Sequence, residues 1–134
     1  MNLFDLKDKT ALITGSTKGI GEAIARQFAN HGAKVVISSR KQDLCEQIKN
    51  DINTENPNSA ISVPCNINQK EQLENLVLET NKQLGDIDIL VCNAAVNPFF
   101  GSSLDIPDDA FDKILNANIK SNHWLCNLVL PQMI

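Results

Sequence analysis

Short apolar segments alternate with longer amphipathic segments along the whole chain. The short segments are rich in Val and Ile and nearly continuous in apolar residues, as parallel strands covered on both faces are. They span residues 10–14, 34–38, 60–65 and 87–92. The longer segments repeat apolar side chains every three to four residues, as amphipathic helices do. They span residues 20–31, 41–53, 69–84 and a stretch from Pro107 onward. This alternation predicts an α/β fold of order β-α-β-α-β-α-β-α, with a parallel sheet, right-handed crossovers and helices on both faces.

Two helix starts can be assigned from local signals. Asn68 stands before the third helical segment and is expected to cap it. Pro107 is expected to be the first residue of the last helical segment, with Asp108 and Asp109 in its first turn.

The most informative motif lies between the first strand and the first helix. Three glycines in such a turn allow a tight bend at Gly15, a close approach of the backbone to a pyrophosphate at Gly19, and close packing of the helix on the sheet at Gly21. The helix N-terminus then offers free N–H groups and a positive dipole end to phosphates. The alternative is a glycine-rich connection without a ligand. The predicted phosphate-binding residues are Gly15, Thr17, Lys18, Gly19, Ile20 and Gly21.

The segment Thr-Gly-Ser-Thr-Lys-Gly-Ile-Gly at 14–21 resembles the cofactor loop of the short-chain dehydrogenase/reductase family. Cys92-Asn93-Ala94-Ala95 is similar to that family's Asn-Asn-Ala-Gly motif, and Asn118 is similar to its helix asparagine. The loop 93–101 resembles a subgroup of NADP-dependent carbonyl and retinal reductases. The resemblance covers the whole chain but only about the N-terminal half of such an enzyme.

The resemblance implies a Rossmann-type doubly wound sheet with strand order 3-2-1-4, incomplete in this chain. It implies hydride transfer between a nicotinamide and a small carbonyl or alcohol substrate, in an enzyme that forms homo-oligomers, either dimers or tetramers. Residues 1–134 are then the N-terminal part of an NADP-binding domain, without the catalytic C-terminal half. Asn93, Ala94 and Ala95 are carried over as cofactor-binding residues.

The residues after the second strand favour NADP over NAD. An NAD site usually has an acidic residue there for the ribose 2′-hydroxyl, whereas this chain has Ser39 followed by Arg40. A hydroxyl and a guanidinium suit a 2′-phosphate, and Lys18 is a second cation for it. The alternative is that Arg40 and Lys41 only solvate a helix start.

The residues after the third strand are assigned to the adenine end of the cofactor. Asn66 stands where the family usually has Asp, and Ile67 is expected to pack on the ring. The alternative for Asn66 is a capping or turn residue.

The catalytic group of the family is only partly present. The resemblance implies a Tyr acid/base, a Lys, a Ser and a helix Asn whose backbone supports a water in the proton relay. Asn118 is that Asn, but the chain contains no Tyr. The chain alone is therefore expected to be inactive, and to be a fragment, a truncated product or part of a longer protein. The alternatives to an enzyme half are a non-catalytic dinucleotide-binding module and a partner-binding fragment.

An incomplete domain should also expose apolar surface. We expect an open edge at residues 87–92 and an apolar patch on the last helix formed by Trp124, Leu125, Leu128 and Val129.

Composition excludes several other classes. The net charge of −4 argues against a nucleic-acid partner, and no window has the roughly 18 consecutive apolar residues of a membrane helix. The start of the chain does not resemble a signal peptide. The four Cys show neither a zinc spacing nor a disulfide framework, so we expect reduced thiols, no metal and a cytoplasmic location.

Overall fold

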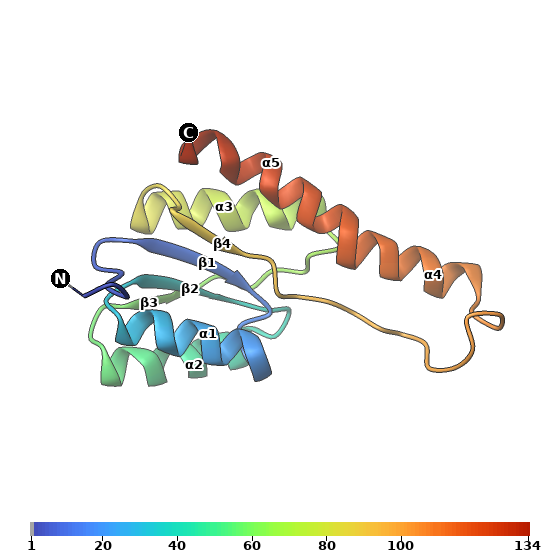
Figure 1. The fold of residues 1–134 in the computed structure, drawn as a ribbon, viewed down its shortest axis with the longest axis horizontal. Coiled ribbons are helices and arrows are strands. Elements are labelled where there is room, and N and C mark those ends of the chain that lie inside the picture. The colour runs from blue at the N-terminus through green and yellow to red at the C-terminus, as the bar shows by residue number, and fades with distance from the viewer. Residues whose placement is uncertain (1) are drawn as a thin grey trace.

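Four parallel strands form the central sheet in the computed structural model, which describes residues 2–134 (Figure 1). The strands are β1 (Thr10–Thr14), β2 (Lys34–Ser38), β3 (Ala60–Ser62) and β4 (Ile89–Val91). Their order is β3-β2-β1-β4, and all pairs are parallel. In the register, Leu12 of β1 lies between Val36 of β2 and Leu90 of β4. The order 3-2-1-4 and the incomplete Rossmann-type architecture are confirmed.

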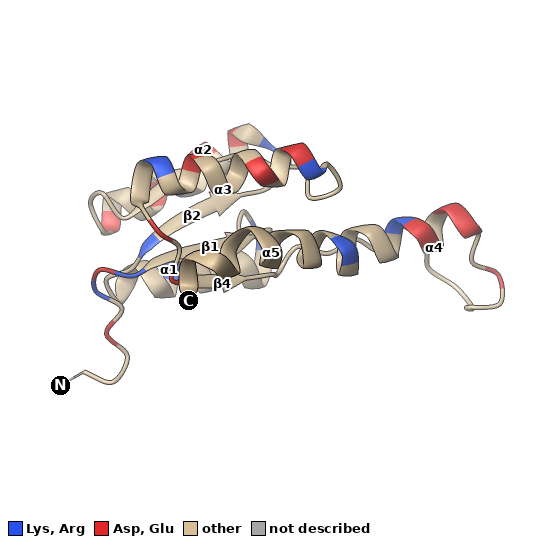
Figure 2. Cartoon of the chain, turned by 90° about the horizontal axis from the view of Figure 1, so that it is seen from above, with Lys and Arg blue, Asp and Glu red and all other residues tan. Residues whose placement is uncertain are grey.

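Helices cover both faces of this sheet (Figure 1). They are α1 (Gly19–Asn30), α2 (Gln42–Glu55), α3 (Lys70–Leu84), α4 (Asp108–Leu115), the π-helical turn η1 (Asn116–Lys120) and α5 (Ser121–Met133). Helices α1 and α2 lie on one face, and α3 and α5 lie on the other. The long loop after β4 then leads to α4, which extends beyond the end of the sheet and buries none of its residues (Figures 1 and 2).

The sheet separates two hydrophobic clusters because successive strand residues point to opposite faces. Ala11 and Ile13 of β1 pack with α1 and α2, whereas Leu12 between them packs with α3 and α5. Full burial of one such Leu or Ile side chain contributes about 1.5–3 kcal/mol. The near-continuous apolar runs in β1 and β2 therefore reflect the two-sided burial that the sequence predicted.

Two strands are shorter than expected, for local reasons. The third ends at Ser62 because Pro64 has no N–H, although the amide groups of Val63 and Cys65 still donate to carbonyls of β2 and Ser39. The fourth begins at Ile89 rather than at residue 87.

Asp88 explains where β4 begins. Its backbone N–H donates to the Thr10 carbonyl at 2.9 Å, and its carboxylate accepts the Thr10 N–H at 2.9 Å. Asp88 therefore completes the first hydrogen bonds of β1.

Both helix-start assignments were wrong. The residue that precedes α3 is Gln69, without a side-chain cap, and the backbone N–H of Asn68 instead donates to the side chain of Asn66. Pro107 lies one residue before α4, with φ −67° and ψ 150°, so it ends the extended loop rather than opening the helix. Acidic Asp108 and Asp109 do occupy the first turn of α4, where the helix dipole favours them (Figure 2).

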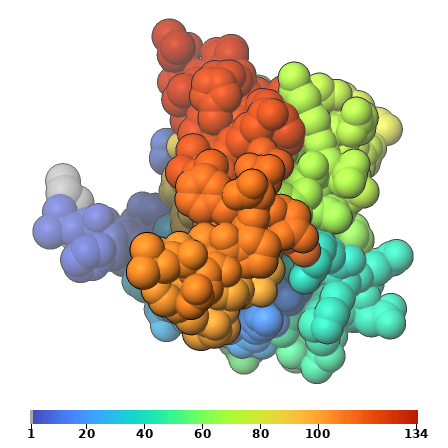
Figure 3. Space-filling model, turned by 90° about the vertical axis from the view of Figure 1, so that its right-hand side faces the viewer, coloured from blue at the N-terminus to red at the C-terminus, as the bar shows by residue number. Residues whose placement is uncertain are grey.

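The exposed apolar surface differs in detail from the expectation. Leu125 and Val129 are buried against α3 and the sheet, and Ile87, expected at the open edge, is only 1% exposed. The exposed apolar side chains of the last helical segment are Phe111, Leu115, Ile119, Leu130 and Met133. They lie along α4, η1 and α5, the consecutive helical segments that run from orange to red in Figure 3.

Among residues 2–134, the helices contain no apolar stretch of the length that a membrane span requires.

Candidate functional site

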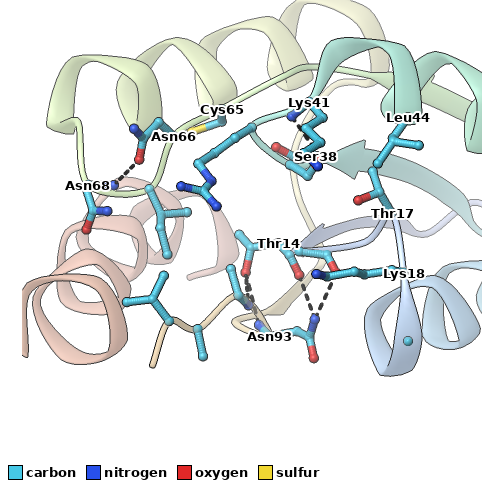
Figure 4. A pocket seen from close by; sticks show the side chains of 18 of the residues that line it. Thr14, Thr17, Lys18, Ser38, Lys41, Leu44, Cys65, Asn66, Asn68 and Asn93 are labelled. Atoms are coloured by element: carbon cyan, nitrogen blue, oxygen red, sulfur yellow. Dashed lines mark hydrogen bonds between the residues drawn. The ribbon is translucent and has the colours of Figure 1, made fainter. Parts of the chain in front are cut away.

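A cavity of about 600 Å³ opens at the carboxyl ends of the four strands. The loops after β1, β2, β3 and β4 all contribute side chains to it (Figure 4). Every residue that the sequence assigned to cofactor binding lines this cavity, except Gly21. Asn118 does not line it either, but it contacts Val96, which does. Sequence reasoning assigned no cofactor-binding role to Thr14, Ser38, Lys41, Leu44, Cys65, Asn68 and Val96, which also line the cavity.

The glycine-rich loop forms the part of the cavity beside β1. Gly15 and Gly19 adopt the left-handed conformation, with φ of +62° and +58°. Gly21 does not line the cavity, yet a Cβ on it would lie 2.2 Å from the carbonyl oxygen of Gly15. The positive φ at the first two positions therefore favours glycine, and at the third position a side chain would overlap the loop.

The N-terminus of α1 faces the same cavity without a side-chain cap. The helix begins at Gly19, preceded by Lys18, whose side chain makes no capping hydrogen bond. Unpartnered N–H groups at a helix start form an anion site together with the helix dipole. This end of α1 therefore has the chemistry of a phosphate site.

A buried serine fixes the loop to β2. Ser16 is fully buried, and its backbone N–H donates to the Ser38 carbonyl at 3.0 Å. The Ser38 N–H donates back to the Ser16 hydroxyl at 2.8 Å. This reciprocal pair holds the loop after β1 against the end of β2.

Asn93 joins the same loop to the end of β4. Its Nδ2 donates to the carbonyl oxygens of Thr14 at 3.1 Å and Gly15 at 3.0 Å (Figure 4). The Thr14 hydroxyl in turn accepts the backbone N–H groups of Asn93 and Ala94, both at 3.0 Å. Asn93 therefore lines the cavity and also holds the loop after β1 against the end of β4.

Asn118 lies in the π-helical turn η1 and acts on the loop after β4. Its Oδ1 accepts the Val96 N–H at 2.8 Å, and its Nδ2 donates to the Val96 carbonyl at 3.0 Å. The Asn118 carbonyl accepts a hydrogen bond from Asn122 Nδ2 at 3.0 Å. The side chain thus pairs with both backbone groups of one loop residue, Val96, as a neighbouring strand would.

Three positively charged side chains border the cavity. Lys18, Arg40 and Lys41 are exposed, and no Asp or Glu lines the cavity within residues 2–134. Over that same range, none of the three makes an ion pair. Ser39 beside them accepts the Lys41 N–H at 3.2 Å. The β2 side of the cavity is therefore positively charged and suits a dianionic group.

Neither Cys65, which lines the cavity, nor Cys92, which precedes Asn93, has a lowered pKa. Burial raises the pKa of Cys65 to about 12. Burial also raises the pKa of Cys92, to about 11, and the neighbouring Cys126 thiol adds to that rise. Both thiols are therefore protonated at neutral pH, which argues against a nucleophilic role. Residues 2–134 contain no group of His, Cys, Asp and Glu side chains that could hold a metal ion.

Known proteins resemble this chain throughout its length. Residues 9–134 match the family model for short chain dehydrogenases. Dehydrogenase/reductase SDR family member 4 of Homo sapiens is 45% identical over 128 residues, which cover 96% of this chain and 46% of that protein. Human mitochondrial dehydrogenase/reductase SDR family member 2 is 42% identical over 128 residues, covering 96% of this chain and 45% of that protein. The chain thus spans about half the length of the curated relatives it matches.

Solved structures agree with the sequence relatives. A short-chain type dehydrogenase/reductase from Mycobacterium marinum superposes with a TM-score of 0.90 at 31% identity, covering 98% of this chain and 52% of that one. The L-sorbose reductase of Gluconobacter frateurii, complexed with NADPH and L-sorbose, superposes with a TM-score of 0.91 at 25% identity, covering 97% and 49%. Together with the loop, the strand order and the family match, these likenesses show that the chain belongs to the short-chain dehydrogenase/reductase family of oxidoreductases, which bind nicotinamide dinucleotides.

Proposed function

We propose that this chain is the cofactor-binding part of an NADP(H)-dependent oxidoreductase, which transfers hydride between the nicotinamide and a small carbonyl or alcohol substrate. The observation that carries the choice of NADP is the cation-rich, carboxylate-free wall of the cavity beside β2. NADPH is also the cofactor named for the similar L-sorbose reductase.

The cavity suits each part of NADP in the order of the strands. The pyrophosphate is assigned to the uncapped N-terminus of α1, where Gly19 has no Cβ and no atom within 4 Å of where one would lie. The 2′-phosphate is assigned to Ser39 and Arg40 after β2, with Lys18 as a second cation. The nicotinamide end is assigned to the loop after β4, at Asn93–Ala95.

The bound cofactor supplies the hydride acceptor or donor, and this chain supplies binding and orientation. The bonds from Asn118 to Val96 hold the loop after β4 beside the assigned nicotinamide end. A Tyr acid/base is absent from the 134 residues. The family resemblance assigns the Tyr, its Lys and a Ser to sequence beyond this chain in the whole enzyme.

Reversing the charge at Arg40 tests the cofactor assignment. A charge-assisted hydrogen bond contributes about 1.5–3 kcal/mol, so Arg40→Asp should weaken NADPH relative to NADH by about tenfold or more. Dissociation constants for both dinucleotides are measured by calorimetry on wild type and variant. Lys9→Asp is the matched control, because exposed Lys9 precedes β1, at the end of the strand away from the cavity. An NADPH-to-NADH ratio that Arg40→Asp leaves unchanged would refute the NADP assignment.

A further inference from the structure

Two backbone N–H groups hold Ser39 at the end of β2. Ser39 follows this strand directly, lines the cavity and is one of the residues assigned above to the 2′-phosphate. Its hydroxyl oxygen accepts the Lys41 N–H at 3.2 Å, as the dashed line beside Lys41 in Figure 4 shows. Its carbonyl oxygen accepts the Cys65 N–H at 2.9 Å. The backbone of Ser39 and one acceptor position of its hydroxyl are therefore fixed.

A further contact to Ser39 comes from Cys45, a residue of α2 that does not line the cavity. Cys45 is fully buried in the hydrophobic cluster that α1 and α2 form on the sheet. It lies near the start of α2, where its N–H donates to the Lys41 carbonyl at 3.1 Å. The Cα–Cβ bonds of a helix tilt toward its N-terminus, so the thiol points back toward residues 39–41. Its Sγ lies 3.5 Å from Ser39 Oγ and 3.7 Å from the Ser39 carbonyl oxygen.

The thiol contacts the Ser39 hydroxyl without competing strongly for its hydrogen. A serine hydroxyl has one hydrogen to donate, whereas a thiol is only a weak donor and a weak acceptor. If the S–H group donates to Ser39, the hydroxyl hydrogen stays free to point into the cavity. If the hydroxyl donates to the sulfur instead, a phosphate oxygen forms the stronger, charge-assisted bond and replaces it. In both arrangements the sulfur helps to keep the side chain in the rotamer that also accepts the Lys41 N–H.

We propose that Cys45 is a positioning residue for the choice of cofactor, because it holds the Ser39 hydroxyl in the rotamer that donates to the ribose 2′-phosphate of NADP. The inference rests on the proposed function, since it requires a 2′-phosphate beside Ser39. NADPH and NADH differ only in that phosphate. A buried residue outside the cavity therefore contributes to the selectivity between them.

The experiment compares the dissociation constants of NADPH and NADH, measured by calorimetry for wild type, Cys45→Ala and Ser39→Ala. The ratio of the two constants isolates the 2′-phosphate, because it cancels changes that affect both dinucleotides equally. Ser39→Ala removes the hydroxyl and should lower the preference for NADPH by about tenfold or more. Cys45→Ala keeps the hydroxyl but gives its side chain access to other staggered rotamers, so the preference should fall by about threefold. Alanine is a strong helix former, so this variant should fold.

A double substitution tests whether Cys45 acts through the Ser39 hydroxyl. In a Ser39→Ala background, Cys45→Ala should leave the ratio unchanged, because the hydroxyl that it would release is gone. Cys45→Ser keeps a polar atom that can contact Ser39, so its ratio should stay within about twofold of wild type. Ile52→Val is the matched control for lost volume, because Ile52 is buried in the same helix and cluster and does not line the cavity. It should lower stability to urea without changing the ratio.

The outcomes distinguish the inference from the proposed function. If the wild type binds NADPH no more tightly than NADH, the NADP assignment fails and the inference fails with it. If the wild type prefers NADPH but Cys45→Ala changes the ratio no more than Ile52→Val does, the inference alone is overturned. A fall in the ratio that persists in the Ser39→Ala background also overturns it, because Cys45 then acts through another part of the site.

Discussion

Replacing Gly21 with alanine tests whether close packing or helix propensity determines the effect of a side chain at this position. Gly21 is the third residue of α1, where intrinsic propensity predicts that alanine stabilises the helix by about 0.5–1 kcal/mol. The structure predicts the opposite sign. The new Cβ would lie 2.2 Å from the Gly15 carbonyl oxygen and 2.5 Å from Asn93 Nδ2.

Neither of these neighbours can move freely. The Gly15 oxygen is backbone, and Asn93 Nδ2 is held by hydrogen bonds to Thr14 and Gly15. Relief of the overlap must shift α1 away from the loop or break those bonds. Overpacking of this kind costs about 1–3 kcal/mol, which outweighs the propensity gain. Gly21→Ala should therefore lower the free energy of unfolding by about 1–2 kcal/mol and weaken dinucleotide binding, although residue 21 lines no part of the cavity.

Urea denaturation and calorimetric titration with NADPH measure the two effects. Gly85→Ala is the control, because Gly85, at the C-terminal end of α3 with φ of +85°, has open space where the Cβ would lie. The control should lose about 1–3 kcal/mol, because its φ of 85° and ψ of −153° lie in a region that residues with a Cβ rarely adopt, while it keeps wild-type affinity for NADPH. A Gly21→Ala variant that is as stable as wild type and binds NADPH equally well would refute the packing argument.

Cys92 should react slowly with iodoacetamide near neutral pH, because burial raises its pKa to about 11. The rate of alkylation should rise about tenfold per pH unit up to that pKa. A rate that levels off at the ordinary thiol pKa of about 8.5 would contradict the burial argument. Asn118→Ala should lower the hydrogen-exchange protection of the Val96 amide by about tenfold, whereas Asn122→Ala should not, because only Asn118 bonds to Val96. The 134-residue chain should not reduce aldehydes or ketones with NADPH, because a positioned acid/base contributes about 10²–10⁴-fold and the chain has no Tyr; turnover by the purified chain would show that another group serves.

The limits of a strand were predictable where a run of apolar residues is buried on both faces of the sheet. The Val- and Ile-rich runs of β1 and β2 were predicted with their observed limits, since both are buried on two faces. The limits of β3 and β4 were not, because they depend on the missing N–H of Pro64 and on the contact between Asp88 and Thr10. That contact joins residues 78 positions apart, so no local pattern reports it.

The placement of the candidate site followed from its glycines and from family resemblance, whereas the contacts that shape it did not. Ser16 and Thr14 are common residue types whose roles depend on which strand end lies beside them. The π-helical turn at Asn118 was also missed, because the local sequence continues a helical pattern across it. A contact with Val96, 22 residues away, accompanies the change in helical geometry. Such turns occur often at functional sites.

The polar side chains that shape the cavity form a connected series across the strand ends. Ser16 links the loop after β1 to β2, Asn93 links it to β4, and Asn118 links the loop after β4 to η1. Each pairs with backbone groups that would otherwise be left unpaired where the sheet ends. Loop backbones held in this way are arranged before a ligand arrives, which lowers the ordering cost of binding. Substitution of Ser16, which does not line the cavity, should therefore weaken dinucleotide binding by displacing the glycine loop, as Gly21→Ala should.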